Sequence, residues 1–264
     1  MITLIRNLVR HRELLFNLTL RDIKSRYAQS FLGIAWAIVQ PLSMVLIFSM
    51  VALFVKIPTD GLPRPIFYFA AVLPWTFFSA ALNQSIPSIV TNSNLVRKIY
   101  FPREIFPMSA ILACLFDLGI STVIFAGFFV YYKVKVTAWV LLFPVLLAVQ
   151  TVLMLAIALL GAGLNVYFRD IRTALPLVLQ LWMYASPVIY SLNEVRNANI
   201  AEVWKKLYEL NPMAGLIDGF RNVLLKGQPP DFHALAISLV ASLILLQICY
   251  RLFKRLESKF ADVI

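Results

Sequence analysis

Six stretches of the chain are almost free of Asp, Glu, Lys and Arg: residues 31–55, 66–90, 105–132, 136–168, 173–193 and 234–250. The third stretch carries one charged residue, Asp117. A helix needs about 20 residues to cross the hydrocarbon of a bilayer. Because lipid offers no hydrogen-bonding partner, each stretch should fold as a helix that pairs its own backbone groups. The pattern therefore predicts an all-α integral membrane protein with six transmembrane helices.

Composition supports this prediction and gives the chain an orientation. The 264 residues are 61% hydrophobic and only 14% charged, with a mean hydropathy of +0.81, whereas soluble domains carry about 25% charged residues. The net charge is +11, which in so apolar a chain favours a membrane surface over nucleic acid as partner. With six spans, one side collects 15 Lys and Arg against 9 on the other. The positive-inside rule then places both termini in the cytoplasm.

Residues 1–30 predict a basic amphipathic helix at the cytoplasmic interface of the membrane. Four leucines lie on one face of this helix, and polar residues lie on another at helical spacing: Arg6, Arg10, Glu13, Asn17, Arg21 and Lys24. The helix could serve only as an anchor. Alternatively, its last turns could also meet a cytoplasmic partner through Arg21, Asp22, Lys24, Arg26 and Tyr27.

The cytoplasmic segment 91–104 predicts a short helix over residues 95–100. Asn92, Ser93 or Asn94 could cap it, and Pro102 disfavours helical geometry at the residue before it. Such a helix would expose apolar and aromatic side chains beside basic ones: Leu95, Ile99, Tyr100 and Phe101 beside Arg97, Lys98 and Arg103. This composition is typical of an interface hot spot. An interfacial loop whose aromatic rings anchor in the headgroups is an equal alternative.

The outer segment 194–233 is too structured for a plain loop. Apolar residues repeat at helical spacing over 200–208 and again over 216–224, and Asn211-Pro212 separates the two runs. We expect two short helices that lie on the outer face or dip back as a re-entrant pair before the last span.

Enzyme and metal motifs are absent from the sequence. No phosphate-binding Gly-x-x-x-x-Gly-Lys-Ser/Thr loop occurs, and Cys114 and Cys249 show neither metal-ligand spacing nor a disulfide framework. Asp117 is the one ionisable residue near the middle of a span, which makes it a candidate for ion coupling. A hydrogen bond that packs two helices together is the structural alternative, and no basic residue in another span offers it a partner.

Aromatic side chains are concentrated in or beside the first, second and fifth stretches. Interfacial belts and packing account for many of them. Several lie too deep for a belt, however, and aromatic faces could stack on the sugar rings of a polymer. The candidates for a translocation path are Trp36, Phe67, Tyr68, Trp75, Phe78, Trp182, Tyr184 and Tyr190.

A set of short motifs resembles the permease subunit of bacterial type-2 ABC exporters of polysaccharide, which export O-antigen, capsule or teichoic acid. The similarity runs almost end to end, through residues 21–27, 30–36, 40–42, 95–104, 167–171, 182–190, 211–213 and 219–221. It implies one permease domain over residues 1–264 that forms a homodimer and carries two cytoplasmic ATP-binding subunits. ATP and Mg²⁺ would bind to those partners, and this chain would be a transport subunit without a cofactor.

The resemblance also assigns roles to the unusual segments. It implies that 1–30 is the interface helix and that 194–233 holds periplasmic gate helices with Trp204, Asn211, Pro212, Phe220 and Arg221. Segment 91–104 would be the helix that couples to the ATPase, through Leu95, Arg97, Lys98, Tyr100, Phe101, Arg103 and Glu104. A lipid-linked glycan, O-antigen in the first instance, would leave the cytoplasm across the bacterial inner membrane. Exporters of teichoic acid, drugs or small lipids, an ion-coupled transporter using Asp117 and a membrane glycosyltransferase are the competing hypotheses.

Overall fold

A computed structural model describes residues 2–28, 31–98, 101–199, 201–258 and 260 of the chain. Every regular element in these residues is helical. The long and medium helices are α1 (Ile2–Arg10), α2 (Arg12–Tyr27), α3 (Trp36–Val55), α4 (Arg64–Ser85), α7 (Ile105–Tyr131), α8 (Phe143–Tyr167), α9 (Asp170–Tyr184), α11 (Glu202–Glu209), α12 (Pro212–Arg221) and α13 (Phe232–Glu257). The shorter ones are η1 (Gly33–Ala35), α5 (Ser88–Thr91), α6 (Ser93–Lys98), η2 (Ala138–Leu142), α10 (Leu192–Asn197) and η3 (Asn222–Lys226).

Five helical segments within the described residues are long and apolar enough to cross a membrane. They are Gly33–Val55, Arg64–Ser85, Ile105–Tyr131, Ala138–Tyr167 and Phe232–Glu257. The chain is therefore a multi-pass helical membrane protein. These five segments correspond to the first four predicted spans and the last one.

The fifth predicted span, residues 173–193, is shorter in the structure than expected. Helix α9 has 15 residues and ends at Tyr184, so it extends about 22 Å at 1.5 Å per residue, against a hydrocarbon core of about 30 Å. Pro187 follows three residues later and biases Ser186 away from helical geometry. The apolar stretch continues to 193, but its backbone turns at 185–190. Apolar length alone therefore overestimated this helix.

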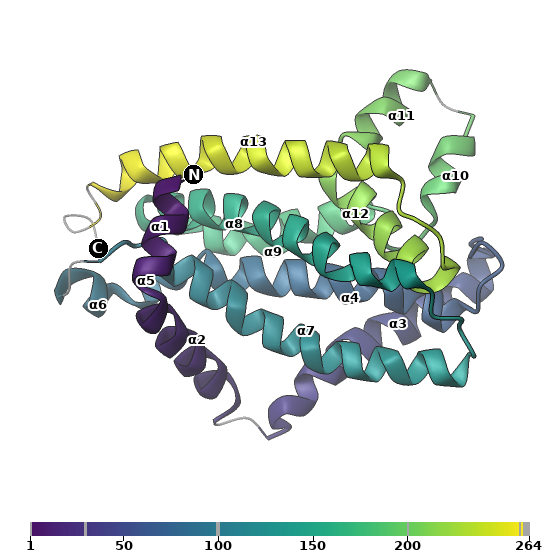
Figure 1. Cartoon of the computed structure of the whole chain (residues 1–264), viewed down its shortest axis with the longest axis horizontal. Helices are drawn as coiled ribbons and strands as arrows, with labels where there is room; N and C mark the ends of the chain where they lie inside the picture. Colours follow the sequence, from purple (N-terminus) through teal and green to yellow (C-terminus); the bar gives the residue numbers. More distant parts are fainter. Residues whose placement is uncertain (1, 29–30, 99–100, 200, 259, 261–264) are drawn as a thin grey trace.

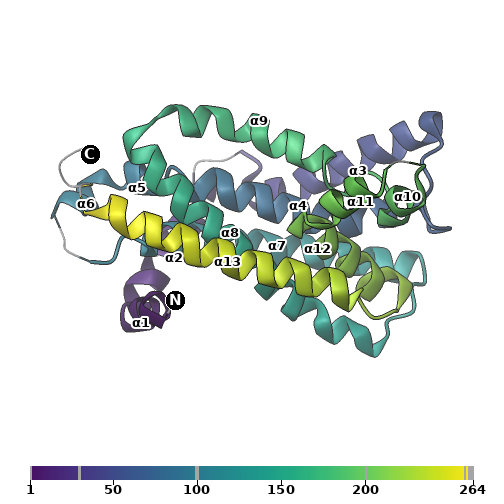
Figure 2. The same ribbon diagram turned by 90° about the horizontal axis from the view of Figure 1, so that it is seen from above.

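Helix α4 forms the centre of the bundle and is the most buried of the five spanning segments. Helices α3, α7, α8, α9 and α12 all contact it, and α13 packs along α8. Figure 2 shows α9 running along one side of the bundle and α13 along another. Helix α2 lies across α7.

The non-spanning helices collect at the two ends of this bundle. Helices α1, α5 and α6 and the last turns of α13 lie at one end, whereas α10, α11 and α12 lie at the other (Figure 1). The expected grouping of segment 91–104 with the N-terminal helix, opposite segment 194–233, is thus present in the fold. The fold leaves open which end faces the cytoplasm, so that assignment stays a prediction.

Candidate coupling surface and gate

Segment 91–104 contains the short helix that its sequence predicts. Helix α6 begins at Ser93, and the carbonyl of Asn92 accepts hydrogen bonds from the amides of Leu95 and Val96. Arg97 and Lys98 are exposed at its end, and no described residue forms an ion pair with either of them. The helix therefore presents free positive charge at its end of the bundle.

Phe101 corrects one expectation for this segment. Its side chain is buried, and its ring packs against Phe106 with the centroids 5.3 Å apart. It therefore anchors the segment to the bundle and is not offered to a partner, while Leu95 is half-buried. Ile99 and Tyr100 lie outside the described residues, so their predicted roles stay predictions.

Glu104 joins three parts of the chain at this end. Its carboxylate is fully buried and pairs with Lys254 of α13, with the Lys254 Nζ–Glu104 Oε2 distance at 2.8 Å. The Asn7 side-chain amide of α1 donates to its other oxygen at 2.8 Å. Glu257 extends the network because it accepts from the Arg103 amide at 3.1 Å and pairs with Lys254 at 2.7 Å. A shift of segment 101–104 would therefore displace its hydrogen-bonding partners on α1 and α13.

A cleft of about 760 Å³ opens beside this network. Residues from α1, from the loop after α6 and from the end of α13 line it, among them Arg10, Phe101, Arg103 and Lys254. The sequence alone could not find this surface, because its three parts are far apart along the chain.

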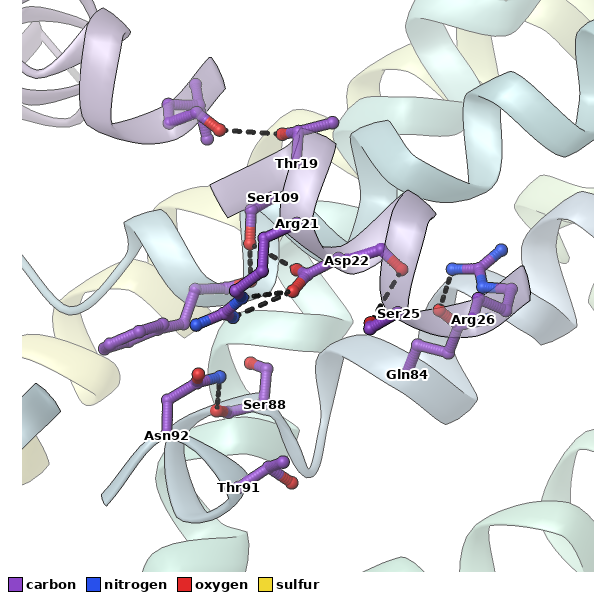
Figure 3. A network of polar contacts seen from close by, with 12 residues as sticks. Thr19, Arg21, Asp22, Ser25, Arg26, Gln84, Ser88, Thr91, Asn92 and Ser109 are labelled. Atoms are coloured by element: carbon purple, nitrogen blue, oxygen red, sulfur yellow. Dashed lines mark hydrogen bonds and ion pairs between the residues drawn. The ribbon is translucent and has the colours of Figure 1, made fainter. Parts of the chain in front are cut away.

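The single N-terminal helix that the sequence predicts is divided in the structure into α1 and α2, with a turn at His11. The end of α2 is fixed on the spanning helices by polar contacts (Figure 3). Asp22 accepts a hydrogen bond from the Ser109 hydroxyl of α7 at 3.1 Å and pairs with Arg21 at 2.8 Å. Arg26 donates to Asp117 of α7 and to Gln84 of α4. Arg21 and Lys24 remain exposed. One face of α2 therefore faces the bundle, and the other is free.

Asp117 has partners that the sequence reading did not identify. Arg26 forms an ion pair with it, and the Tyr27 hydroxyl donates to its second oxygen. Both partners come from α2, outside the spans in which a basic residue was sought. Burial, together with the hydrogen bond to the Asp117 carboxylate, raises the pKa of Tyr27 to about 12. Tyr27 therefore keeps its proton at neutral pH and stays a donor.

A cavity of about 220 Å³ adjoins this ion pair. Arg26, Tyr27, Gln84 and Asp117 line one part of it, and Trp36 of α3 lines another. Trp36 is half-exposed, at 53%. Of the predicted path residues, it is the one that borders this cavity.

Arg221 organises the opposite end of the bundle. Its guanidinium is buried and donates to three backbone carbonyls, of Pro187 at 2.6 Å, Val188 at 2.7 Å and Tyr190 at 2.7 Å. It also stacks on the Phe67 ring, 3.9 Å from the centroid. Buried backbone carbonyls need such internal partners, so Arg221 stabilises the turn after α9. Burial lowers the pKa of Arg221 to about 10, which leaves it protonated at neutral pH.

Asn211 ties the break between the two outer helices to the end of α9. Its side-chain oxygen caps α12 by accepting from the Met213 amide at 3.1 Å, and it also accepts from Trp182 Nε1 at 3.0 Å. Its amide nitrogen donates to the Ala185 carbonyl at 2.9 Å and to Ser186 Oγ at 3.0 Å. Two helices lie on either side of the predicted Asn-Pro break, whereas their re-entry into the membrane stays a prediction. Pro212 is half-buried as the first residue of α12.

The two outer helices differ in exposure. Helix α11 is exposed and shows Trp204 to the surroundings, whereas α12 buries Phe220 and Arg221 in the bundle. Four predicted path aromatics are likewise buried inside the chain: Phe67, Tyr68, Trp75 and Phe78. Trp182 packs edge-on against Phe78, with the centroids 5.1 Å apart. Tyr190 donates to the Tyr184 carbonyl at 2.9 Å, and Tyr184 itself is exposed.

These features define a helical, multi-pass membrane protein with buried polar ties at both ends. The chain belongs to the ABC-2 type transporter family of membrane proteins, which matches residues 13–225. It is 31% identical to the O-antigen export system permease protein RfbA of Myxococcus xanthus over 267 residues, with 100% of each chain covered. It is 26% identical to an RfbA of Klebsiella pneumoniae, covering 96% of this chain and 95% of that protein. The polysialic acid transport protein KpsM of Escherichia coli is 24% identical, over 91% of this chain and 92% of that one.

Proposed function

We propose that the chain is the permease subunit of an ATP-driven exporter of lipid-linked polysaccharide, with O-antigen as the first candidate. The observation that carries this proposal is full-length similarity to a permease named for O-antigen export. Similarity to a polysialic acid transport protein extends over 91% of the chain and supports polysaccharide as the shared substrate class. Teichoic acid, drugs or small lipids are the alternative cargoes.

The proposed topology places both termini and α6 on the cytoplasmic side of the bacterial inner membrane. The excess of Lys and Arg at that end supports it. Helices α1 and α2 would lie in the headgroup zone, with the exposed Ile5, Val9 and Phe16 toward lipid. We assign α9 as a short fifth crossing of six. Helix α12 would re-enter the membrane from the outer side, which its burial in the bundle supports.

Helix α6 is the proposed contact with a separate ATP-binding subunit, which would hold ATP and Mg²⁺. Its exposed Arg97 and Lys98 would meet the partner, and the Glu104 network would transmit the movement to α1 and α13. The glycan would then pass between two copies of the chain, along surfaces that include Trp36 and Tyr184. Asp117 is engaged by Arg26 and Tyr27, which supports a structural role over ion coupling.

Deletion of the gene in its host tests the cargo. We expect the surface polysaccharide to disappear and lipid-linked polymer to accumulate inside the cell, measured by surface staining and fractionation. Restoration by the plasmid-borne gene is the control. Normal surface polysaccharide in the deletion strain would refute the proposal, and loss of a different polymer would identify the alternative cargo.

Arg97→Glu in the restored strain tests the coupling helix. A reversed charge at a protein interface costs several kcal/mol when it meets like charge, so export should fall while the protein stays inserted. Lys135→Glu is the matched control because Lys135 is exposed at the opposite end of the bundle. Full export by the Arg97→Glu variant would show that α6 does not contact the ATP-binding subunit.

A further inference from the structure

A large apolar groove lies on the outside of the bundle between α3 and α7. Its volume is about 1,060 Å³, and its walls include Leu46 and Met50 of α3 and Ile124 and Phe128 of α7. The two helices diverge toward the end of the bundle at which α4 begins (Figure 2). The groove exceeds the roughly 300–1,000 Å³ of ordinary small-molecule sites, and its walls belong to spanning helices, so hydrocarbon surrounds it.

One end of this groove is polar and positive. Arg64, the first residue of α4, lines it and is half-buried, and its side chain makes no hydrogen bond or ion pair with any other residue that the structure describes. Tyr131 and Tyr132 lie at the same end, as is usual for tyrosines at the level of the headgroups. An occupant with an anionic head and an apolar body would fit both the positive end and the apolar walls.

We propose that this groove is a binding site for an anionic phospholipid. The acyl chains fill the space between α3 and α7, and the phosphate pairs with Arg64. A guanidinium and a phosphate form charge-assisted, often bidentate hydrogen bonds. The bound lipid wedges the two helices and ties the start of α4 to the membrane surface.

Space-filling substitutions on α7 test the acyl-chain site. Gly127 lines the groove, and a Cβ there would meet nothing within 4 Å. Gly127→Phe should therefore fold and lower the retention of phosphatidylglycerol about tenfold, since displacing even two buried methylenes weakens lipid binding by that order. Gly119→Phe is the matched control because Gly119 is equally open but lies outside the groove. Native mass spectrometry of the purified assembly, with added phosphatidylglycerol or phosphatidylcholine, measures the lipid retained.

Charge substitutions test the headgroup site. Arg64→Gln should lower phosphatidylglycerol retention about fivefold and leave phosphatidylcholine nearly unchanged, whereas Arg64→Lys should preserve the preference. Lys135→Gln, which removes a charge at the same end outside the groove, should have no effect.

Three results would overturn the proposal. The first is equal lipid retention by Gly127→Phe and Gly119→Phe, and the second is retention that ignores the headgroup charge. The third is a changed oligomeric mass of Gly127→Phe with its lipid intact, which would place a second copy of the chain in the groove.

Discussion

At the scale of single residues, the Arg221 side chain is distinguished by its three hydrogen bonds to backbone carbonyls of another segment. Three carbonyls of segment 187–190 depend on it, and its positive charge rests on the Phe67 ring. A lysine could reach fewer of these acceptors, because its single ammonium lacks the planar fork of a guanidinium. The turn after α9 and the burial of α12 therefore depend on one side chain.

Arg221→Met tests this dependence. Unpaired buried carbonyls cost about 1–3 kcal/mol each, so the variant should lose about 3 kcal/mol or more of stability and expose segment 185–210 to protease. Thermal unfolding and limited proteolysis in detergent measure both effects. Arg97→Met is the control because Arg97 is exposed. Equal unfolding temperatures for the two variants would show that the carbonyls find other partners.

The Arg26–Asp117 pair makes a second prediction at this scale. Each side chain alone would leave a half-buried charge without its partner, so Arg26→Met and Asp117→Asn should each destabilise the protein. Because the two residues share one interaction, the double variant should lose less than the sum, with a coupling of about 1–3 kcal/mol. Thermal unfolding of the wild type, the two single variants and the double variant gives the coupling energy. Strictly additive losses of stability would show that the two residues do not interact. An ion-coupled mechanism would instead require that Asp117→Asn alone abolish transport and its pH dependence.

The sequence could nominate Asp117 and Arg221 but could not supply their partners. Asp117 stands out because a lone acid in a span is costly, yet its partner is 91 residues away in a helix read as an interface anchor. For Phe101 the prediction of an exposed ring was wrong. The composition of segment 91–104 suggested that this ring lies on the surface, and only its packing against Phe106 in the structure shows that it is buried.

At the scale of elements, capping and breaking residues predicted the helices better than the lengths of the uncharged stretches did. The Asn-Pro break, helix α6 and the left-handed Gly227 after η3 all follow from capping and breaking residues. The end of α9 follows from them only in part, because Ala185 and Ser186 keep the stretch uncharged, and Pro187 turns the backbone together with the Arg221 contacts. Tertiary hydrogen bonds across 31–34 residues decide that helix end.

Arg196 joins two outer helices to the start of the spanning helix α13 and makes the next prediction. From α10 it pairs with Glu209 at the end of α11 at 3.0 Å and with Asp231 before α13 at 2.8 Å. Burial opposes the charged form of Asp231, but hydrogen bonds from Arg196 and from the first amides of α13 outweigh it and hold the pKa of Asp231 below its usual 3.8. The lowered pKa means that this tie is fully present above that value and is lost as the pH falls below it.

Hydrogen exchange of residues 192–209 measures this tie. From about pH 6 to about pH 3, protection of α10 and α11, corrected for intrinsic exchange, should fall about threefold, a modest change because the groups are partly exposed. Arg196→Gln should show low protection at both pH values. Lys205→Gln, which removes an exposed pair inside α11, should keep the wild-type pH dependence. A pH-independent wild type would contradict the assignment.

At the scale of the whole molecule, two apolar faces remain uncovered. Helix α3 is the least buried spanning segment, and beside its groove face it exposes Ile47, Val51 and Phe54 at helical spacing. Helix α9 exposes Leu177 and Leu181. Lipid could cover either face, but α9 is too short to cross the hydrocarbon alone, so a second copy of the chain that covers α9 and α3 would shield its ends. We therefore expect the proposed homodimer to form through these two helices.

Alanine pairs on two helices separate packing against a second copy from packing against lipid. Helix association in membranes depends on side-chain packing, so Leu177→Ala with Leu181→Ala should raise the dimer dissociation constant about tenfold, or about 1.4 kcal/mol. Ile244→Ala with Ile248→Ala is the matched control, because both isoleucines are exposed at the same spacing on α13. Concentration-dependent mass measurements in detergent give both constants. If the α13 pair weakens the dimer and the α9 pair leaves it intact, the two copies meet through α13, and the path between them cannot include Trp36 and Tyr184.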